Sequence, residues 1–396
     1  MTISKAYDIL PLMFKAGNYQ SQGSYKAFIP ERINQHIELT DPRVSLLLAE
    51  AMRYLGELNA YSQLVPDIDF FIKMHVVKEA TISSRIEGTK TNIEEAVKSK
   101  EEIVPKDRDD WEEVQNYIKA INYAVGRLKD LPLSLRLVNE THQILLSGVR
   151  GYSKTPGEIR KSQNWISGSG ADINAAAFVP PPAPLVPELL SDLQAFWHNK
   201  DLLIPDLVRI AISHYQFETI HPYLDGNGRI GRLLITLQLV DAKILKVPAL
   251  YFSDYLERNR GSYFDSLDRV RQSNDIEQWV RFFLSGVAET AKDARDTLSK
   301  VVELRADYID RIEKGVGIRR TANAKALLPH LFAKPIVSVN DVEKTLGVVG
   351  QTANVLVDDL VKIGLLSEIT GKQKNRIFVL KEYLDLFRDQ KRRTND

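Results

Sequence analysis

The sequence predicts a mostly helical fold with a short β-hairpin near its middle and a winged helix-turn-helix at its C-terminal end. Apolar residues recur at helical spacing along most of the 396 residues. Between Gly151 and Pro187 glycines and prolines interrupt that pattern. After Asp275 the order becomes a long helix, three shorter helices and two short strands, which is the order of a winged helix-turn-helix.

Length and composition limit the function classes. Apolar residues make up 44% of the chain and charged residues 27%, as in ordinary globular proteins. The 53 basic and 52 acidic residues balance, so the global charge does not predict a nucleic-acid or membrane partner. The sequence has no cysteine, which excludes disulfides and thiolate chemistry. Without a signal-type segment or a long apolar run, we expect a cytoplasmic protein that does not bind membranes.

The length favours more than one domain. We expect a helical N-terminal region over residues 1–105, a helical core over 106–300, and a linker helix with the winged helix-turn-helix over 301–396. In the first region, the spacing predicts helices from Pro42 to Leu58 and from Phe70 to Ile86. In the core it predicts helices over residues 111–128, 133–146, 187–198 and 205–219.

The interrupted stretch of the core predicts the hairpin. Trp165 and Ile166 precede two glycines, Gly168 and Gly170, which suit a tight turn. The segment Phe178-Val-Pro-Pro-Pro182 then predicts an extended polyproline conformation.

The C-terminal part predicts a helix from Asp275 to about Arg311, and the shorter elements follow it. These are helices over residues 322–331, 340–345 and 351–363, a turn at Gly347, and strands near 365–366 and 377–379. The expected recognition helix carries Asp358 and Asp359 against Lys362, which is poor electrostatics for a DNA groove. The pattern therefore favours protein docking or a homodimer over DNA.

The segment Ile220-His-Pro-Tyr-Leu-Asp-Gly-Asn-Gly-Arg-Ile-Gly-Arg232 carries the features of a phosphate-handling loop. Gly226 and Gly228 allow the backbone to come close to a ligand. An apolar helix follows directly, and its first amide groups form an anion site. His221 titrates near neutral pH, which suits a general base.

Three charged residues complete this loop. Asp225, just before the helix, offers a carboxylate for Mg²⁺. Arg229 and Arg232 lie three residues apart on one helical face, so both can reach the same polyphosphate. A base, a carboxylate, glycines and arginines occur together within one short segment. A plain connection between two helices explains this combination less well than a phosphate-binding site does.

The segment His221 to Arg232 resembles the signature of the Fic family, His-Pro-Phe-x-Asp-Gly-Asn-Gly-Arg-x-x-Arg, with Tyr223 in place of Phe. The resemblance implies a Fic-type helical core and transfer of AMP from ATP to a Ser, Thr or Tyr hydroxyl of a protein. By this resemblance His221 is the base, Asp225 binds Mg²⁺, and pyrophosphate leaves. The resemblance also assigns Gly226, Asn227 and Gly228 to an anion hole, and Arg229 and Arg232 to the β- and γ-phosphates.

The same resemblance gives roles to other segments. The hairpin from Asn164 to Ala177 matches the family's flap, which pairs with a segment of the target protein; a plain surface hairpin is the alternative. Tyr263 and Phe264 fall where the family places aromatic residues beside adenine, although two core aromatics on a helix explain them equally well.

The segment Ser83-Ser-Arg-Ile-Glu87-Gly88 resembles the family's inhibitory helix. Ser83 and Glu87 share one helical face. The resemblance implies that Glu87 pairs with Arg232 and keeps it from the γ-phosphate, which would make the enzyme autoinhibited. A surface glutamate beside a helix end is the alternative.

Two other functions stay open at this stage. One is an ATP-sensing regulator whose tail binds DNA or a partner protein. The other is a phosphotransferase, although relatives with that chemistry carry Ala-Asn-Lys where this chain has Gly226-Asn-Gly228.

Overall fold

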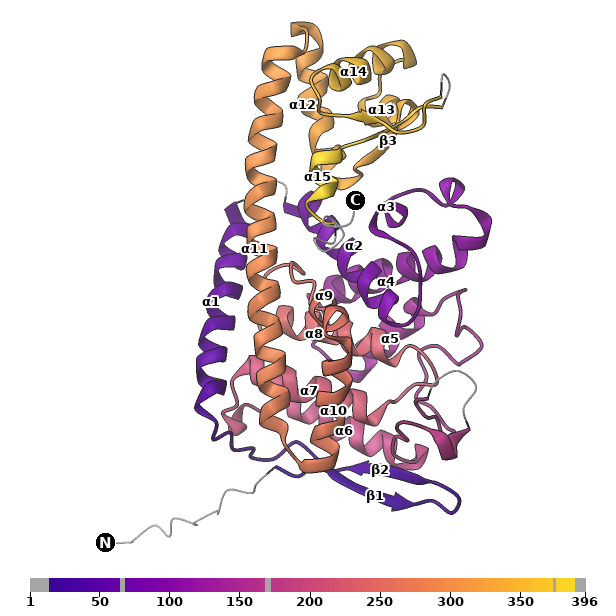
Figure 1. Ribbon diagram of the computed structural model, residues 1–396, viewed down its shortest axis with the longest axis vertical. Coiled ribbons are helices and arrows are strands. Elements are labelled where there is room, and N and C mark those ends of the chain that lie inside the picture. Colours follow the sequence, from indigo (N-terminus) through magenta and orange to yellow (C-terminus); the bar gives the residue numbers. More distant parts are fainter. Residues whose placement is uncertain (1–13, 65–67, 168–171, 373–374, 389–396) are drawn as a thin grey trace, which may run out of the picture. The chain divides into compact units, whose positions relative to one another are not determined.

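The computed structural model describes residues 14–64, 68–167, 172–372 and 375–388, and it confirms a mostly helical fold (Figure 1). Among these residues, no helix is both long and apolar enough to cross a bilayer. The α-helices are α1 (Pro42–Leu64), α2 (Ile68–Ile86), α3 (Ile93–Ala96), α4 (Arg108–Arg127), α5 (Leu135–Leu145), α6 (Val186–His198), α7 (Asp206–Ile220), α8 (Asn227–Asp241), α9 (Ser253–Arg258), α10 (Arg260–Ser273), α11 (Ile276–Gly315), α12 (Ile318–Ala333), α13 (Val339–Leu346), α14 (Gly350–Lys362) and α15 (Lys381–Asp385). Short 3₁₀ turns are η1 (Lys100–Glu102), η2 (Pro105–Asp107), η3 (Ile173–Ala175), η4 (Ala183–Leu185) and η5 (Lys200–Leu202), and the strands are β1 (Gly17–Ser21), β2 (Lys26–Pro30), β3 (Ile336–Ser338), β4 (Ser367–Glu368) and β5 (Ile377–Val379).

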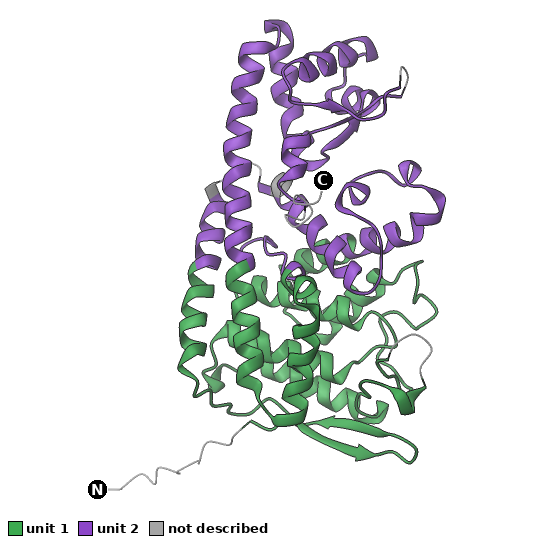
Figure 2. Ribbon diagram, in the orientation of Figure 1, with its two compact units in different colours: residues 1–53, 119–244, 255–289 green, residues 54–118, 245–254, 290–396 purple. Residues whose placement is uncertain are grey.

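The chain divides into two compact units, coloured green and purple in Figure 2. Unit 1 comprises residues 1–53, 119–244 and 255–289, and unit 2 comprises 54–118, 245–254 and 290–396. Each unit is built from three separate stretches of sequence, and α1, α4, α9 and α11 each contribute residues to both. The domain boundaries predicted at residues 105 and 300 describe domains that follow one another along the sequence, and they remain a prediction.

The core of unit 1 is built around α7 and α8. Every residue of α7 from Leu207 to Ile220 is buried, so this helix is packed on all sides rather than along one stripe. Gly231 of α8 allows close packing against α7, because a Cβ there would lie 2.1 Å from Oε1 of Glu218. Two indole groups also hold α7: Trp279 donates to the carbonyl of Ala211 and Trp197 to the hydroxyl of Ser213.

Unit 1 contains a β-hairpin that the sequence did not predict. Strands β1 and β2 pair antiparallel, with Gly17 opposite Pro30. A Cβ at Gly17 would lie 2.1 Å from the carbonyl oxygen of Ile29, so only glycine fits this position. The N–H of the buried Phe28 donates to the carbonyl of Val179, which joins the hairpin to the polyproline segment.

The hairpin predicted from Asn164 to Ala177 takes a less regular form. Its described residues contain one antiparallel bridge to the following segment, between Ile166 and Phe178, and the turn η3. Both N–H···O bonds of that bridge are present, at 2.8 and 3.1 Å. The glycines predicted to form its turn, Gly168 and Gly170, lie outside the described residues.

The C-terminal part of unit 2 combines the helices α12, α13, α14 and α15 with a small sheet. The strand order is β3-β5-β4, and both pairs are antiparallel. Ser338 begins α13 with a capping box to Asp341, and Gly347 ends it in the left-handed conformation at φ 63°. The turn at Gly347 is thus confirmed, whereas strand β3 was not predicted and β4 lies two residues later than expected.

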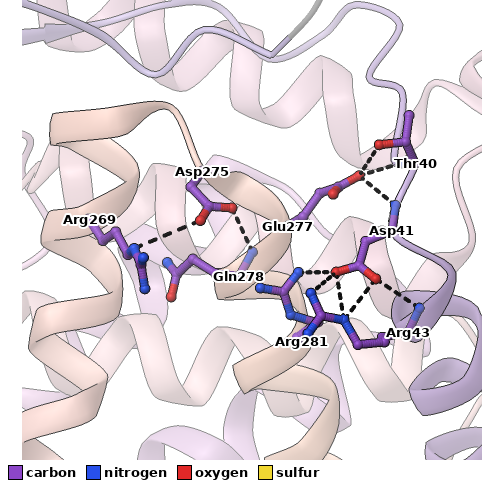
Figure 3. A network of polar contacts seen from close by, with 8 residues as sticks. All are labelled: Thr40, Asp41, Arg43, Arg269, Asp275, Glu277, Gln278 and Arg281. Carbon is purple, nitrogen blue, oxygen red and sulfur yellow. Dashed lines mark hydrogen bonds and ion pairs between the residues drawn. The ribbon is translucent and has the colours of Figure 1, made fainter.

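A polar network ties the start of α1 to the start of α11 in unit 1 (Figure 3). Asp41 accepts hydrogen bonds from the guanidinium groups of Arg43 and Arg281. Glu277 accepts from the backbone N–H groups of Thr40 and Asp41. The hydrogen bonds from Arg43 lower the pKa of Asp41 from 3.8 to about 2.

This network predicts a pH-dependent contribution to stability. Asp41→Asn should lower the melting temperature at pH 7, because the charged carboxylate is the form that the two arginines stabilise. As the pH falls from about 4 to about 2, Asp41 becomes protonated in the wild type and the difference should shrink. Calorimetry of both proteins across this range measures it, with Asp201→Asn, at an exposed aspartate outside the network, as control. A difference that stays constant down to pH 2 would contradict the assignment.

Candidate active site

The segment predicted to handle phosphate forms the turn between α7 and α8 in unit 1. His221 caps the end of α7 in the left-handed conformation, at φ 50° and ψ 61°. A non-glycine residue held there costs about 1–3 kcal/mol, and such strain is often found at functional sites. Gly226, at φ 77°, begins α8, whose first intrahelical bond runs from the N–H of Ile230 to the carbonyl of Gly226. The amide groups of the first turn therefore face the loop.

Asn227 braces the loop with its side chain. Its Oδ1 accepts from the backbone N–H of Tyr223 and its Nδ2 donates to the carbonyl of Tyr223, both at 2.8 Å. The side chain is 3% exposed. The part of Asn227 that can take up an anion is consequently its backbone N–H, together with that of Gly228.

Tyr223 is the aromatic anchor of the loop. Its ring stacks on His142 at 3.8 Å between centroids and 10° between planes, and its hydroxyl donates to Asn139 at 2.7 Å. His142 in turn bonds the carbonyl of Asp225 through Nε2 and accepts the N–H of Gly157 at Nδ1. Burial lowers the pKa of His142 to about 4, so this ring is neutral at pH 7 and donates from Nε2.

Asp225, which the sequence analysis predicts to bind Mg²⁺, lies just before the start of α8. One carboxylate oxygen accepts the N–H of Gly226 at 2.6 Å and lies 3.6 Å from Arg229, which is 1% exposed. The other faces Gly151, where a Cβ would come within 2.8 Å of it. The carboxylate is about a third exposed, so an ion can reach it. A single carboxylate plus substrate phosphates is an ordinary way to bind Mg²⁺, and Asp225 fits that role.

The remaining predicted nucleotide residues have different environments. Arg232 follows Arg229 on α8 and is 3% exposed. Tyr263 is 1% exposed and its hydroxyl bonds His214, so it belongs to the core of unit 1. Phe264 is 46% exposed, and of this pair it is the ring that an adenine could reach.

The residues of the predicted inhibitory helix belong to unit 2. Ser83 lies in α2 and is fully buried, while Glu87 follows the last helical residue, Ile86, and is exposed. Ser84 accepts the N–H of Glu87 at its carbonyl. The pairing of Glu87 with Arg232 remains a prediction.

Several residues of the site were missed by the sequence analysis. No role is assigned to His142 from the sequence, and nothing in its own segment indicates its contact with Asp225. Arg160 and Asn164 donate to the carbonyl of His221, at 2.9 and 3.2 Å. The turn residues Pro156-Gly157, three residues before Arg160, are the sequence feature that could have pointed to this arginine.

Comparisons with known proteins match the part of the chain that carries this turn. Residues 132–239 match the description "Fic/DOC family", and residues 45–126 match "Fic/DOC family N-terminal". The chain contains a Fic/DOC family domain. The matched region includes the whole turn between α7 and α8 and extends back through α5, which carries His142 and Asn139.

The relatives are distant. The chain is 29% identical to a probable protein adenylyltransferase of Aquifex aeolicus over 50% of this chain and 56% of that protein. It is also 29% identical to the protein adenylyltransferase Fic of Aedes aegypti, over 42% of this chain and 30% of that protein. The chain thus spans about half, or less, of the curated relatives it matches.

A solved structure shares the fold over most of the chain. The crystal structure of a Fic family protein from Desulfovibrio desulfuricans G20 has a TM-score of 0.57 and 22% sequence identity, covering 88% of this chain and 98% of that one. At this identity the likeness concerns the fold alone.

The contact of Gly151 with Asp225 gives a test of the site. Gly151→Ala should weaken Mg²⁺-dependent ATP binding about tenfold, because the new Cβ displaces the carboxylate that is the predicted metal ligand. Titration calorimetry with ATP and Mg²⁺ measures the affinity. Gly148→Ala is the matched control, since Gly148 also has a positive φ, 69°, but has open space around it. Equal affinities in the two variants would argue against this role of Asp225.

Proposed function

We propose that this chain is a protein adenylyltransferase, which moves AMP from ATP to a Ser, Thr or Tyr hydroxyl of a target protein and of itself. The observation that carries the proposal is the turn between α7 and α8. It places a histidine with a fixed backbone next to a helix N-terminus and a reachable carboxylate, in a chain with a Fic/DOC family domain.

In the proposed reaction, the target hydroxyl attacks the α-phosphorus of ATP and gives its proton to His221. The bond between the α-phosphorus and the bridging oxygen breaks, and pyrophosphate leaves with the β- and γ-phosphates. The backbone N–H groups of Asn227 and Gly228 bind phosphate oxygens, and Arg229 and Arg232 balance the negative charge. Asp225 would hold Mg²⁺, which supplies further charge neutralisation. Transfer of this kind needs mainly positioning and electrostatic stabilisation.

The proposal includes an autoinhibitory role for Ser83 and Glu87. The helix that leads to them is well fixed in unit 2, since Glu79 of α2 accepts hydrogen bonds from Ser253 and from the hydroxyl of Tyr117. Glu79 is 2% exposed. An exposed carboxylate directly after an anchored helix is suited to pair with an arginine, and pairing with Arg232 would withdraw that arginine from the γ-phosphate.

For the C-terminal region we propose a winged helix-turn-helix that docks a protein partner or a second copy. The chain order α12, β3, α13, α14, β4, β5 and the sheet order β3-β5-β4 support the fold. Asp358 and Asp359 are engaged by Arg376 at 3.1 Å and Arg320 at 2.6 Å, so α14 offers little net charge. Val349, just before α14, is 68% exposed, which suits an apolar contact better than a phosphate backbone.

The flap from Asn164 to Ala177 is proposed to receive the target segment by strand addition.

Labelled nucleotides separate the proposal from its rivals. With ATP labelled at the α-phosphate, an adenylyltransferase leaves covalent label on protein, whereas an ATP-sensing regulator leaves none. Label transferred from the γ-phosphate would instead identify a phosphotransferase.

Two substitutions test the proposed roles. His221→Ala should reduce α-label transfer at least about a hundredfold, because the other proton acceptor of the loop, Asp225, is assigned to Mg²⁺. Glu87→Gly should raise self-modification about tenfold or more by releasing Arg232. Autoradiography of the full-length proteins with ATP and Mg²⁺ measures both, with His36→Ala, at an exposed histidine, as control. Equal labelling of the wild type and Glu87→Gly would remove autoinhibition from the account.

A further inference from the structure

The strained backbone of His221 is held by one buried arginine. Carbonyl groups at the end of a helix lack intrahelical partners, and at the end of α7 they converge on Arg160. Its Nε donates to the carbonyl of His221 at 2.9 Å and its Nη2 donates to that of Ile220 at 3.3 Å. Its backbone N–H donates to the carbonyl of Pro222 at 2.9 Å. Arg160 therefore binds three consecutive carbonyls centred on the proposed base.

The same guanidinium also binds the two ends of the flap. Nη1 donates to the carbonyl of Ser162, just before the flap, at 3.2 Å. Nη2 donates to the carbonyl of Pro181, in the polyproline segment after it, at 2.5 Å. Asn164 supports this arrangement, because its amide donates to the carbonyls of His221 and Tyr223, at 3.2 and 2.8 Å.

Arg160 is 2% exposed, and the partners that the structure gives its guanidinium are all carbonyl groups. A buried cation is expensive unless its hydrogen bonds and local dipoles compensate it. Here the negative end of the α7 dipole lies beside it, which favours a cation. Burial lowers the pKa of Arg160 to about 10, so it stays protonated at neutral pH.

We propose that Arg160 is a positioning residue for AMP transfer, which holds His221 in its left-handed conformation so that the imidazole faces the incoming hydroxyl. This inference rests on the proposed function and assigns the orientation of its base to a residue outside the loop. A planar fork with five donors can bind carbonyls in several directions at once, which a lysine ammonium does less well. The amide groups of α8 do not depend on this clamp, so nucleotide binding should survive its loss.

The test compares Arg160→Met and Arg160→Lys in the full chain, in the Glu87→Gly background. For Arg160→Met we expect the single-turnover rate of α-label transfer to fall about a hundredfold, the effect of a misplacement near 1 Å. The dissociation constant for Mg²⁺ and ATP should change less than about threefold. Arg160→Lys should recover part of the rate, and methylguanidinium should partly rescue Arg160→Ala.

Arg209→Met is the matched control. Arg209 is a second buried arginine of unit 1, 4% exposed, and it donates to the carbonyl of Phe196. Loss of either arginine weakens the packing of unit 1, but only Arg160 contacts the end of α7. Amide hydrogen exchange of His221, whose N–H donates to Phe217, gives a readout that does not need activity. Its protection should fall in Arg160→Met and persist in Arg209→Met.

The outcomes distinguish the two ideas. If the reference protein, the Glu87→Gly variant, transfers no α-label, the proposed function is wrong. The role of Arg160 in holding His221 is then judged by hydrogen exchange alone. If the reference is active but Arg160→Met and Arg209→Met lose rate, nucleotide affinity and protection equally, Arg160 is only structural and the inference is overturned.

Discussion

The site depends on how the chain reverses between α7 and α8. A helix packed on all sides ends in a histidine with positive φ, and a second buried helix begins six residues later after a glycine with positive φ. For the histidine this conformation is unfavourable in an isolated chain, whereas glycine adopts a positive φ readily. The burial of both helices and the hydrogen bonds of the loop compensate that cost. As a result, the histidine and the first amide groups of α8 belong to the same turn.

Neutral groups fix the loop from Tyr223 to Asp225, after the carbonyls that Arg160 binds. The amide of Asn227 fixes the backbone of Tyr223, and His142, neutral because it is buried, fixes the carbonyl of Asp225. Charges are concentrated where a polyphosphate would lie, in Asp225 and Arg229. Such a division suits phosphoryl chemistry, because groups that are already oriented need no reorganisation when charge develops.

How much of this could be read from the sequence depends on how local each cause is. The helices were predictable because apolar spacing is a local property, and the chemistry of His221 to Arg232 was visible because one short segment carries it. The clamp by Arg160 and the stack of His142 on Tyr223 were not, since both join residues more than sixty positions apart. The hairpin of β1 and β2 was missed for a similar reason: Gly17 is required by its contact with Ile29. The orientation of Tyr263 into the core depends on His214 on another helix.

The central claim is that ATP binds with its phosphates at the N-terminus of α8, beside His221. A crystal structure of the full chain with Mg²⁺ and a slowly hydrolysed ATP analogue tests it most directly. We expect phosphate oxygens within hydrogen-bond distance of the amides of Asn227 and Gly228, the metal ion on Asp225, and the His221 ring facing the α-phosphorus. Nucleotide bound elsewhere, with that helix end in contact only with protein, would contradict the account.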